Sequence, residues 1–80
     1  MDKQAIEAKV LQCFAMTYKK DVAALSRDTR IVEELSSKSL LMVALVSTVE
    51  NEFDVLIPLP EASKMKTIGD MVDEVCARIE

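Results

Sequence analysis

The chain has 80 residues, half of them apolar, and a net charge of −4. This length suits one small domain, residues 1–80, whose single core can still stabilise itself. The negative charge argues against nucleic acid as a partner, because proteins that bind nucleic acid neutralise phosphates with Lys and Arg. With three aromatic residues, one Gly and two Pro, the composition favours helices packed through Leu, Val, Ile, Met and Ala.

Several classes of site are disfavoured at the outset. There is no histidine and no Cys-x-x-Cys motif, so we expect no metal site. Cys13 and Cys76 lie far apart, and we interpret them as small buried apolar residues, with a disulfide or a reactive thiol as alternatives. Met1 is followed directly by charged residues, without the apolar stretch of a signal peptide. The longest apolar run, 40–46, is too short to span a bilayer, so we expect a cytoplasmic protein without stable membrane insertion.

The first predicted helix begins after Asp2 and ends around Lys19 and Lys20. Asp is a favoured N-cap, and two lysines suit the negative end of a helix. Small and apolar side chains recur on one face at three- and four-residue spacing: Ala5, Ile6, Val10, Cys13, Phe14 and Thr17. Residues 21–38 lack such a period, and we expect a long, partly ordered loop with one helical turn at 31–35.

The second predicted helix covers 39–53. Its apolar residues repeat at helical spacing: Leu40, Val43, Val46, Val49 and Phe53. The run 40–46 alone would also suit a buried strand, and the continuation of the pattern to Phe53 favours a helix.

The rest of the chain predicts a break and two further helices. Residues 54–60 form the break, closed by Pro58 and Pro60, and 61–65 suit a short helix. Thr67 with Asp70 resembles a capping box opening the last helix. Its expected buried stripe is Ile68, Met71, Val72, Val75, Cys76 and Ile79. The predicted fold is therefore an all-α four-helix bundle, with three longer helices, one short helix and a long first loop.

Short motifs at separated points of the chain share one register: Val32-Glu33-Glu34-Leu35, Ser39-Leu40, Glu52-Phe53-Asp54, Ile57-Pro58 and Thr67-Ile68. In their order and spacing they resemble the acyl carrier protein family, and the likeness covers nearly the whole chain. No single one of these motifs is specific, and their joint spacing carries the resemblance.

The resemblance implies a carrier and not an enzyme. Family members hold 4′-phosphopantetheine on the serine that corresponds to Ser39, and the arm carries an acyl group as a thioester. The implied partners are a phosphopantetheinyl transferase and acyl-transferring or acyl-modifying enzymes of fatty acid, lipid or polyketide biosynthesis. The residues expected to line an acyl chain in the bundle are Val43, Val49, Phe53, Ile57 and Ile68.

Ser39 is also open to a simpler interpretation. A serine at a helix start is commonly an N-cap, and Ser36 and Ser37 are rival caps nearby. The same position favours a phosphate, because the helix start presents free N–H groups and the positive end of the dipole.

The chain departs from the family pattern at Lys38, where the motif has an aspartate that the transferase recognises. The Lys38 cation is poorly placed at the positive end of a helix. A phosphodiester on Ser39 would offset this repulsion by forming an ion pair with Lys38. The second helix also lacks acidic residues until Glu50. The charge is uneven along the chain: residues 1–38 contain seven Lys/Arg and six Asp/Glu, whereas residues 39–80 contain three Lys/Arg and eight Asp/Glu.

The start and outer face of the second helix are therefore the predicted docking surface: Lys38, Leu40, Leu41, Met42, Ala44, Ser47 and Glu50. It would serve a dedicated partner or a second copy of the chain, unless the apolar members are simply buried by packing. We expect a specialised carrier. The main alternative is a carrier fold that has lost the prosthetic group and acts as an interaction module. An enzyme is disfavoured by the lack of histidine and of a Gly-rich phosphate loop.

Overall fold

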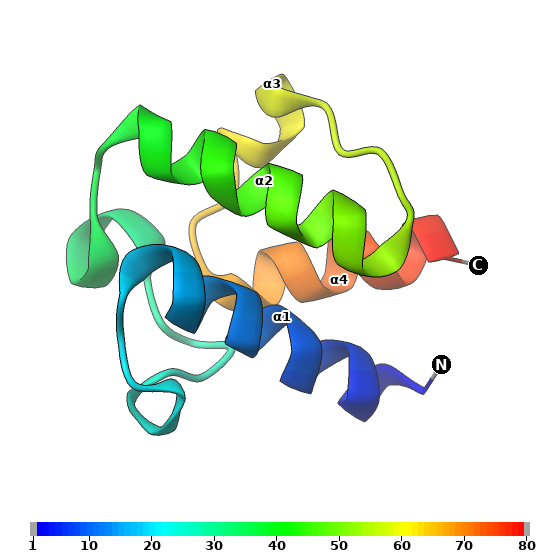
Figure 1. Cartoon of the computed structure of the whole chain (residues 1–80), viewed down its shortest axis with the longest axis horizontal. Helices are drawn as coiled ribbons and strands as arrows, with labels where there is room; N and C mark the ends of the chain where they lie inside the picture. The colour runs from blue at the N-terminus through cyan, green and yellow to red at the C-terminus, as the bar shows by residue number, and fades with distance from the viewer. Residues whose placement is uncertain (1, 80) are drawn as a thin grey trace.

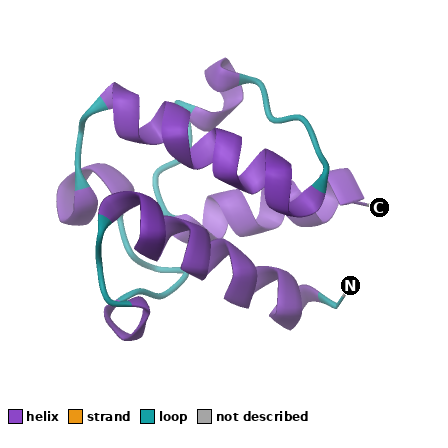
Figure 2. Ribbon diagram, in the orientation of Figure 1, coloured by secondary structure: helices purple, strands orange, loops and turns teal. Residues whose placement is uncertain are grey.

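The computed structural model of the chain describes residues 2–79, which form a bundle of helices (Figure 1). The elements are α1 (Lys3–Tyr18), the 3₁₀ turn η1 (Val22–Ala24), the π turn η2 (Ile31–Leu35), α2 (Ser39–Phe53), α3 (Leu59–Ala62) and α4 (Ile68–Ile79). Within these described residues the chain is helix or loop and no strand is present (Figure 2). The predicted all-α bundle, with three longer helices and a long first loop, is confirmed.

Local capping sets the ends of α1, as the sequence predicts. The Asp2 carboxylate accepts a hydrogen bond from the Ala5 backbone N–H at 2.8 Å. At the other end Lys19 adopts a left-handed conformation with φ 56°, and the Lys20 N–H donates to the Ala15 carbonyl at 2.9 Å. This left-handed residue ends the helix, because it turns the chain away from the helix axis.

The long loop between α1 and α2 is ordered by the start of α4. Three backbone hydrogen bonds join them: Ile31 N–H to Lys66 O (2.9 Å), Ile68 N–H to Thr29 O (3.1 Å) and Gly69 N–H to Arg27 O (2.8 Å). The predicted helical turn at 31–35 is confirmed as η2. The turn η1 was not predicted, and Asp21 caps it by accepting from the Ala23 N–H at 2.9 Å.

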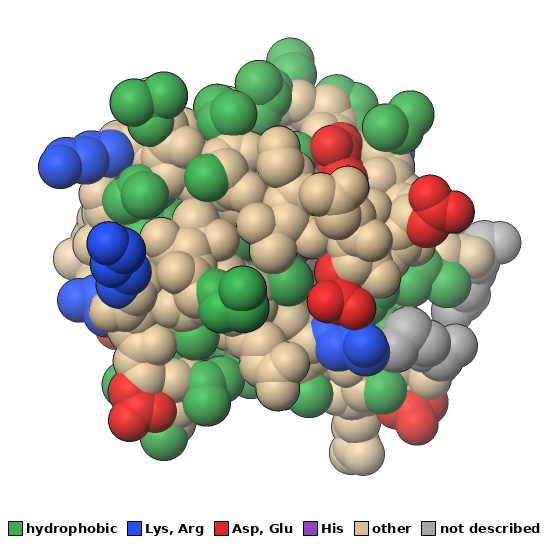
Figure 3. Space-filling model, in the orientation of Figure 1, with side chains coloured by type: hydrophobic (Ala, Val, Ile, Leu, Met, Phe, Trp, Pro, Cys, Tyr) green, Lys and Arg blue, Asp and Glu red, His purple; other side chains and the backbone are tan. Residues whose placement is uncertain are grey.

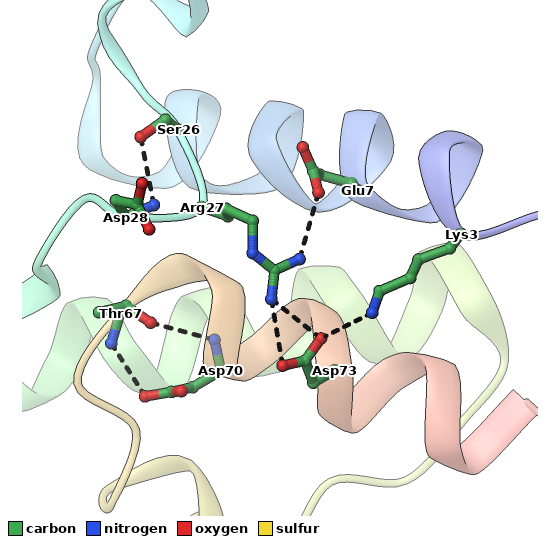
Figure 4. Close-up of polar contacts among 8 residues, drawn as sticks. All are labelled: Lys3, Glu7, Ser26, Arg27, Asp28, Thr67, Asp70 and Asp73. Carbon is green, nitrogen blue, oxygen red and sulfur yellow. Dashed lines mark hydrogen bonds and ion pairs between the residues drawn. The ribbon is translucent and has the colours of Figure 1, made fainter.

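The capping box at the start of α4 is also confirmed (Figure 4). The Asp70 N–H donates to Thr67 Oγ1 at 3.2 Å, and Asp70 Oδ2 accepts from the Thr67 N–H at 3.1 Å. The same carboxylate oxygen accepts from the Lys66 N–H at 2.8 Å. These backbone N–H donors lower the pKa of Asp70. An Asp therefore performs here the task for which Glu or Gln is more usual.

The short helix lies earlier than predicted. Its expected range was 61–65, and α3 runs from Leu59 to Ala62 with Pro58 as its N-cap. The prediction took Pro60 as the end of a break. A proline is tolerated in the first turn of a helix, because the N–H it lacks would have no intrahelical partner there.

The core lies where α1 packs against α2 and α4 (Figure 1). Its largest fully buried side chains are Phe14, Ile31, Leu45, Ile68, Met71, Val10, Val49, Val72 and Val75. The expected stripes of α1 and α4 are buried or half-buried. The orientation of α2 differs from the prediction: Leu40 and Val43 of its periodic set are 81% and 42% exposed, and Leu45 is fully buried.

The two cysteines fit the interpretation as apolar residues. Both are free thiols, with Cys13 buried and Cys76 half-buried against the core. Burial raises the pKa of the Cys13 thiol, which disfavours the reactive thiolate.

Two further absences hold for residues 2–79. None of the helices there combines the length and apolar character that crossing a membrane requires. No cluster of three Cys, Asp or Glu side chains is placed to hold a metal ion in this part of the chain.

A charged cluster links α1, the first loop and α4 (Figure 4). Arg27 in the loop reaches Glu7 of α1 at 3.3 Å and both carboxylate oxygens of Asp73 in α4 at 3.1 Å. Lys3 of α1 lies 3.4 Å from the same carboxylate. Arg27 therefore holds the pKa of Asp73 below its usual value, with a smaller effect from Lys3.

Asp73→Asn is expected to make the protein less sensitive to acid. Because the folded-state pKa of Asp73 is lowered, its ionised form stabilises the fold above the unfolded-state pKa. That stabilisation is lost as the pH falls through the folded-state value. The free energy of unfolding should thus fall less in the variant between neutral pH and about pH 3. The effect is modest because the Asp73 side chain is half exposed and solvent screens the pair.

Denaturant unfolding at a series of pH values measures this difference. Asp28→Asn is the matched control, since Asp28 is exposed and forms no ion pair within residues 2–79. Parallel acid profiles for the wild-type protein and the Asp73 variant would show that the Arg27 cluster does not stabilise the fold.

Candidate functional site

Ser39 is the first residue of α2, and its side chain is exposed. The N-cap position belongs to Lys38, whose side chain makes no capping hydrogen bond. The interpretation of Ser39 as an N-cap is therefore wrong. Ser36 does not cap α2 either, because its Oγ accepts from the Lys38 N–H at 3.1 Å and closes the turn before the helix.

The start of α2 is electrostatically suited to an anion. Its first turn contains no acidic residue, and the cation of Lys38 directly precedes it. The first N–H groups of a helix lack intrahelical acceptors and lie at the positive end of the dipole. Figure 3 shows Lys and Arg side chains at the edge of the molecule where α2 begins. A phosphate on Ser39 would thus meet N–H donors and a lysine.

A cavity of about 290 Å³ adjoins Ser39. It is lined by Tyr18 from α1, Ile31, Val32, Ser36 and Ser37 from the first loop, Lys38, Ser39, Met42 and Val43 at α2, and Leu59, Ser63 and Met65 from α3 and the turn after it. Among its polar residues, Ser37, Lys38, Ser39 and Ser63 are exposed and Ser36 is half-buried. Tyr18 and Ile31 are its most buried members, at 7% and 1% exposed.

Tyr18 is one of the two most buried residues that line the cavity. Its ring stacks on Phe14 with centroids 5.8 Å apart. Its hydroxyl is buried without a hydrogen-bond partner among residues 2–79. Burial raises the pKa of this phenol, so the group is a neutral O–H donor at neutral pH.

The predicted acyl-lining residues do not form one wall in this conformation. Val43 borders the cavity beside Ser39. Val49, Ile57 and Ile68 are buried in the core, and Phe53 packs half-buried against it. Their contact with an acyl chain stays a prediction, and it would require the core to separate.

The predicted docking residues fall into two groups. Lys38, Leu40, Ala44 and Ser47 are exposed. Leu41, Met42 and Glu50 are half-buried: the first two pack against the core, and the Glu50 carboxylate accepts from the Ile57 N–H at 2.8 Å. The expectation that Leu41 and Met42 are exposed is therefore wrong. Other hydrophobic side chains are exposed along the edge formed by α2 and α3 (Figure 3).

Sequence reasoning missed most of the cavity wall, including Tyr18, Ile31, Leu59 and Met65. Only Tyr18 had a usable signal, because it follows Phe14 by four residues and continues the apolar stripe of the first helix. The others reach the cavity through the loop and α3, whose positions no local pattern specifies.

The structure is a small helical bundle in which a helix-start serine lies beside a partly apolar cavity, the arrangement that the resemblance to acyl carrier proteins implies. Comparison with known proteins agrees. The chain is similar to the acyl carrier proteins of Rickettsia typhi and Rickettsia prowazekii, each 37% identical over 73 residues. These alignments cover 91% of this chain and 85% of each relative. The acyl carrier protein of Rickettsia canadensis is 36% identical over the same shares.

The chain belongs to the acyl carrier protein family, which confirms the resemblance found in the sequence. No family model matches it. Membership of this family supports a role as a carrier protein and not as an enzyme.

Proposed function

We propose that the protein is a stand-alone acyl carrier that bears 4′-phosphopantetheine on Ser39 and holds an acyl group on it as a thioester. The observation that carries this proposal is the placement of Ser39, exposed at the uncapped start of α2 and lining a partly apolar cavity. When bound, the prosthetic group supplies a flexible arm and a thiol for thioester exchange.

The residues present fit this group. The exposed hydroxyl of Ser39 is open to a phosphopantetheinyl transferase, and the free N–H groups of the first turn favour the phosphodiester. Lys38 can pair with the phosphodiester, since it precedes Ser39 in the chain and makes no cap of its own. The cavity can shelter part of an acyl chain, because its volume equals that of about ten water molecules.

Partner enzymes would dock on the exposed start and outer face of α2. Lys38, Leu40, Ala44 and Ser47 offer that surface a cation and apolar area, where the family pattern has acids. This composition supports a specialised carrier of fatty acid, lipid or polyketide biosynthesis with a dedicated partner. A cytoplasmic location stays part of the proposal.

Lys38 favours one competing function, an unmodified interaction module. It stands where the family motif has the aspartate that the transferase recognises. In that case the exposed face of α2, with Leu40 at 81% exposure, would be the binding surface by itself.

Intact mass after co-expression with a broad-specificity phosphopantetheinyl transferase tests the proposal. We expect a gain of one phosphopantetheine unit in the wild-type protein and none in Ser39→Ala. Ser37→Ala is the matched control, because Ser37 is an equally exposed serine two residues away and should leave the gain intact.

No gain under conditions that modify an ordinary carrier would favour the interaction module. Lys38→Asp then separates the two explanations. A gain restored by this variant would show that Lys38 blocks the transferase, and its continued absence would exclude Ser39 as an attachment site.

A further inference from the structure

Four exposed lysines belong to the segments that form the cavity beside Ser39, and we call them the lysine cluster: Lys19, Lys20, Lys38 and Lys64. Lys38 lines the cavity itself, and the other three lie within two residues of a lining residue, at the end of α1 and after α3. Lys3 and Lys9 near the start of α1 are paired with acids, whereas no member of the cluster forms an ion pair among residues 2–79. These cations are therefore available to a binding partner.

No acidic side chain balances the lysine cluster at the cavity. Among residues 2–79, none of the residues that line the cavity is Asp or Glu. Two acids close to the cluster in the sequence have contacts of their own: Asp21 accepts from the Ala23 N–H at 2.9 Å, and Glu33 lies 3.6 Å from Arg30. Most acidic side chains visible in Figure 3 lie toward the side where α2 ends. The Ser39 end of the bundle is thus locally positive, although the whole chain carries a net charge of −4.

Exposed apolar side chains accompany these lysines. Val32, Val43 and Leu59 line the cavity and are exposed, and Leu40 follows Ser39 directly and is also exposed. Apolar contacts at the centre of an interface supply most of its affinity, whereas surrounding charges govern orientation and the rate of association. Apolar side chains and unpaired cations at one end of the molecule therefore have the composition of a binding surface.

We propose that the Ser39 end of the bundle is a docking surface for a partner protein that presents acidic side chains next to apolar ones. The carboxylates of the partner would meet the lysine cluster, and its apolar side chains would contact Val32, Leu40, Val43 and Leu59. This charge is opposite to the one that the acids of the family pattern require of a partner. The inference rests on the proposed function only in taking the partner to be a protein, which both candidate functions require.

Two other anionic occupants fit the observations less well. An anionic bilayer is flat and extended, so it meets the net negative charge of the whole molecule as well as the lysines, and it fills a hollow poorly. A second copy of the chain could offer the acids at the end of α2. That contact would be head-to-tail, and it would build rings or open chains of copies in which the attachment serine is covered.

Binding of designed peptides tests the charge of the partner. The probes are two helical peptides of about 15 residues, one with Leu on one face and Glu on the other, and one with Lys in place of each Glu. Each is titrated into the isotope-labelled, unmodified protein, and the backbone amide NMR signals are followed. We expect the Glu peptide to shift the signals of residues 18–20 and 38–40, and the Lys peptide to shift none. Raising the salt concentration from about 0.05 M to 0.5 M should weaken binding, because salt screens exposed charges.

Charge reversal within the cluster gives the sharper test. Lys38→Glu should weaken binding of the Glu peptide about tenfold, because an attractive charge contact becomes repulsive. An acid at the start of a helix is favoured by the dipole, so this variant should fold. Lys20→Glu should act in the same direction. Lys3→Glu is the matched control, because it makes the same change in net charge at the opposite end of α1 and should leave the affinity unchanged.

Several results would overturn the inference. Equal affinity for the two peptides, or no shift with either, would exclude an acidic partner surface. Cosedimentation with vesicles of phosphatidylcholine and phosphatidylglycerol would assign the surface to a bilayer. Self-association of the protein alone that Lys38→Glu abolishes would assign it to a second copy.

These outcomes are separate from the test of the proposed function. All of them are measured on the unmodified protein, so they do not depend on a mass gain from the transferase. A mass gain without binding of the Glu peptide overturns the docking inference alone. Binding of the Glu peptide without a mass gain supports the docking surface and overturns the carrier proposal.

Discussion

Replacing Leu45 with alanine is expected to lower the free energy of unfolding by about 2–5 kcal/mol, while Leu40→Ala leaves it within about 0.5 kcal/mol. Leu45 is fully buried and Leu40 is 81% exposed. The first substitution removes apolar area from the core and leaves a cavity, and the second removes a side chain that solvent already surrounds. Both residues lie on α2, so the small change in helix propensity is common to the two variants.

Denaturant unfolding measures both variants. A chain of 80 residues has a total stability of about 4–12 kcal/mol, so Leu45→Ala should shift the midpoint strongly. If that variant does not fold, Leu45→Val retains most of the side chain and still gives a measurable loss. Equal losses at positions 40 and 45 would contradict the orientation of α2 described above.

Gly69→Ala is expected to lower the free energy of unfolding by about 1–2 kcal/mol, although alanine is the better helix former. Gly69 is buried in the first turn of α4, where its N–H donates to the Arg27 carbonyl at 2.8 Å. A Cβ at this position would lie 2.9 Å from that carbonyl oxygen and 3.2 Å from Arg27 Cβ. The first atom belongs to the backbone, so the loop itself must move to relieve the contact.

Ala77→Gly is the matched control, because it makes the reverse exchange at an exposed position of the same helix. It should cost up to about 1 kcal/mol through helix propensity alone. Thermal or denaturant unfolding of the two variants shows whether Gly69→Ala lowers or raises the free energy of unfolding. A gain in stability for Gly69→Ala would mean that propensity prevails and that the loop is not held closely against α4.

The sequence alone was sufficient wherever the determinants are local. The start of α1 and the start of α4 were predicted because Asp2, Thr67 and Asp70 bond to backbone groups within four residues of themselves. The short helix was misplaced because Pro60 suits both a break and a first helical turn. The position of Ser39 at the start of α2 follows from the same local patterns.

The orientation of α2 was not determined by the sequence. Its first half is apolar on nearly every side, so periodicity could not choose between Leu40 and Leu45 as the buried residue. Packing against α1 makes that choice, because the helix turns the side that best fills the space between the two helices inward.

The cavity depended most on tertiary structure. Its wall draws on α1, the first loop, α2 and α3, and the loop itself is held in place by hydrogen bonds to the start of α4. The sequence by itself determined the three longer helices, the family and the serine at the start of α2. Only packing between distant segments decided which residues join Tyr18 around the cavity beside that serine, because these residues lie far apart in the sequence.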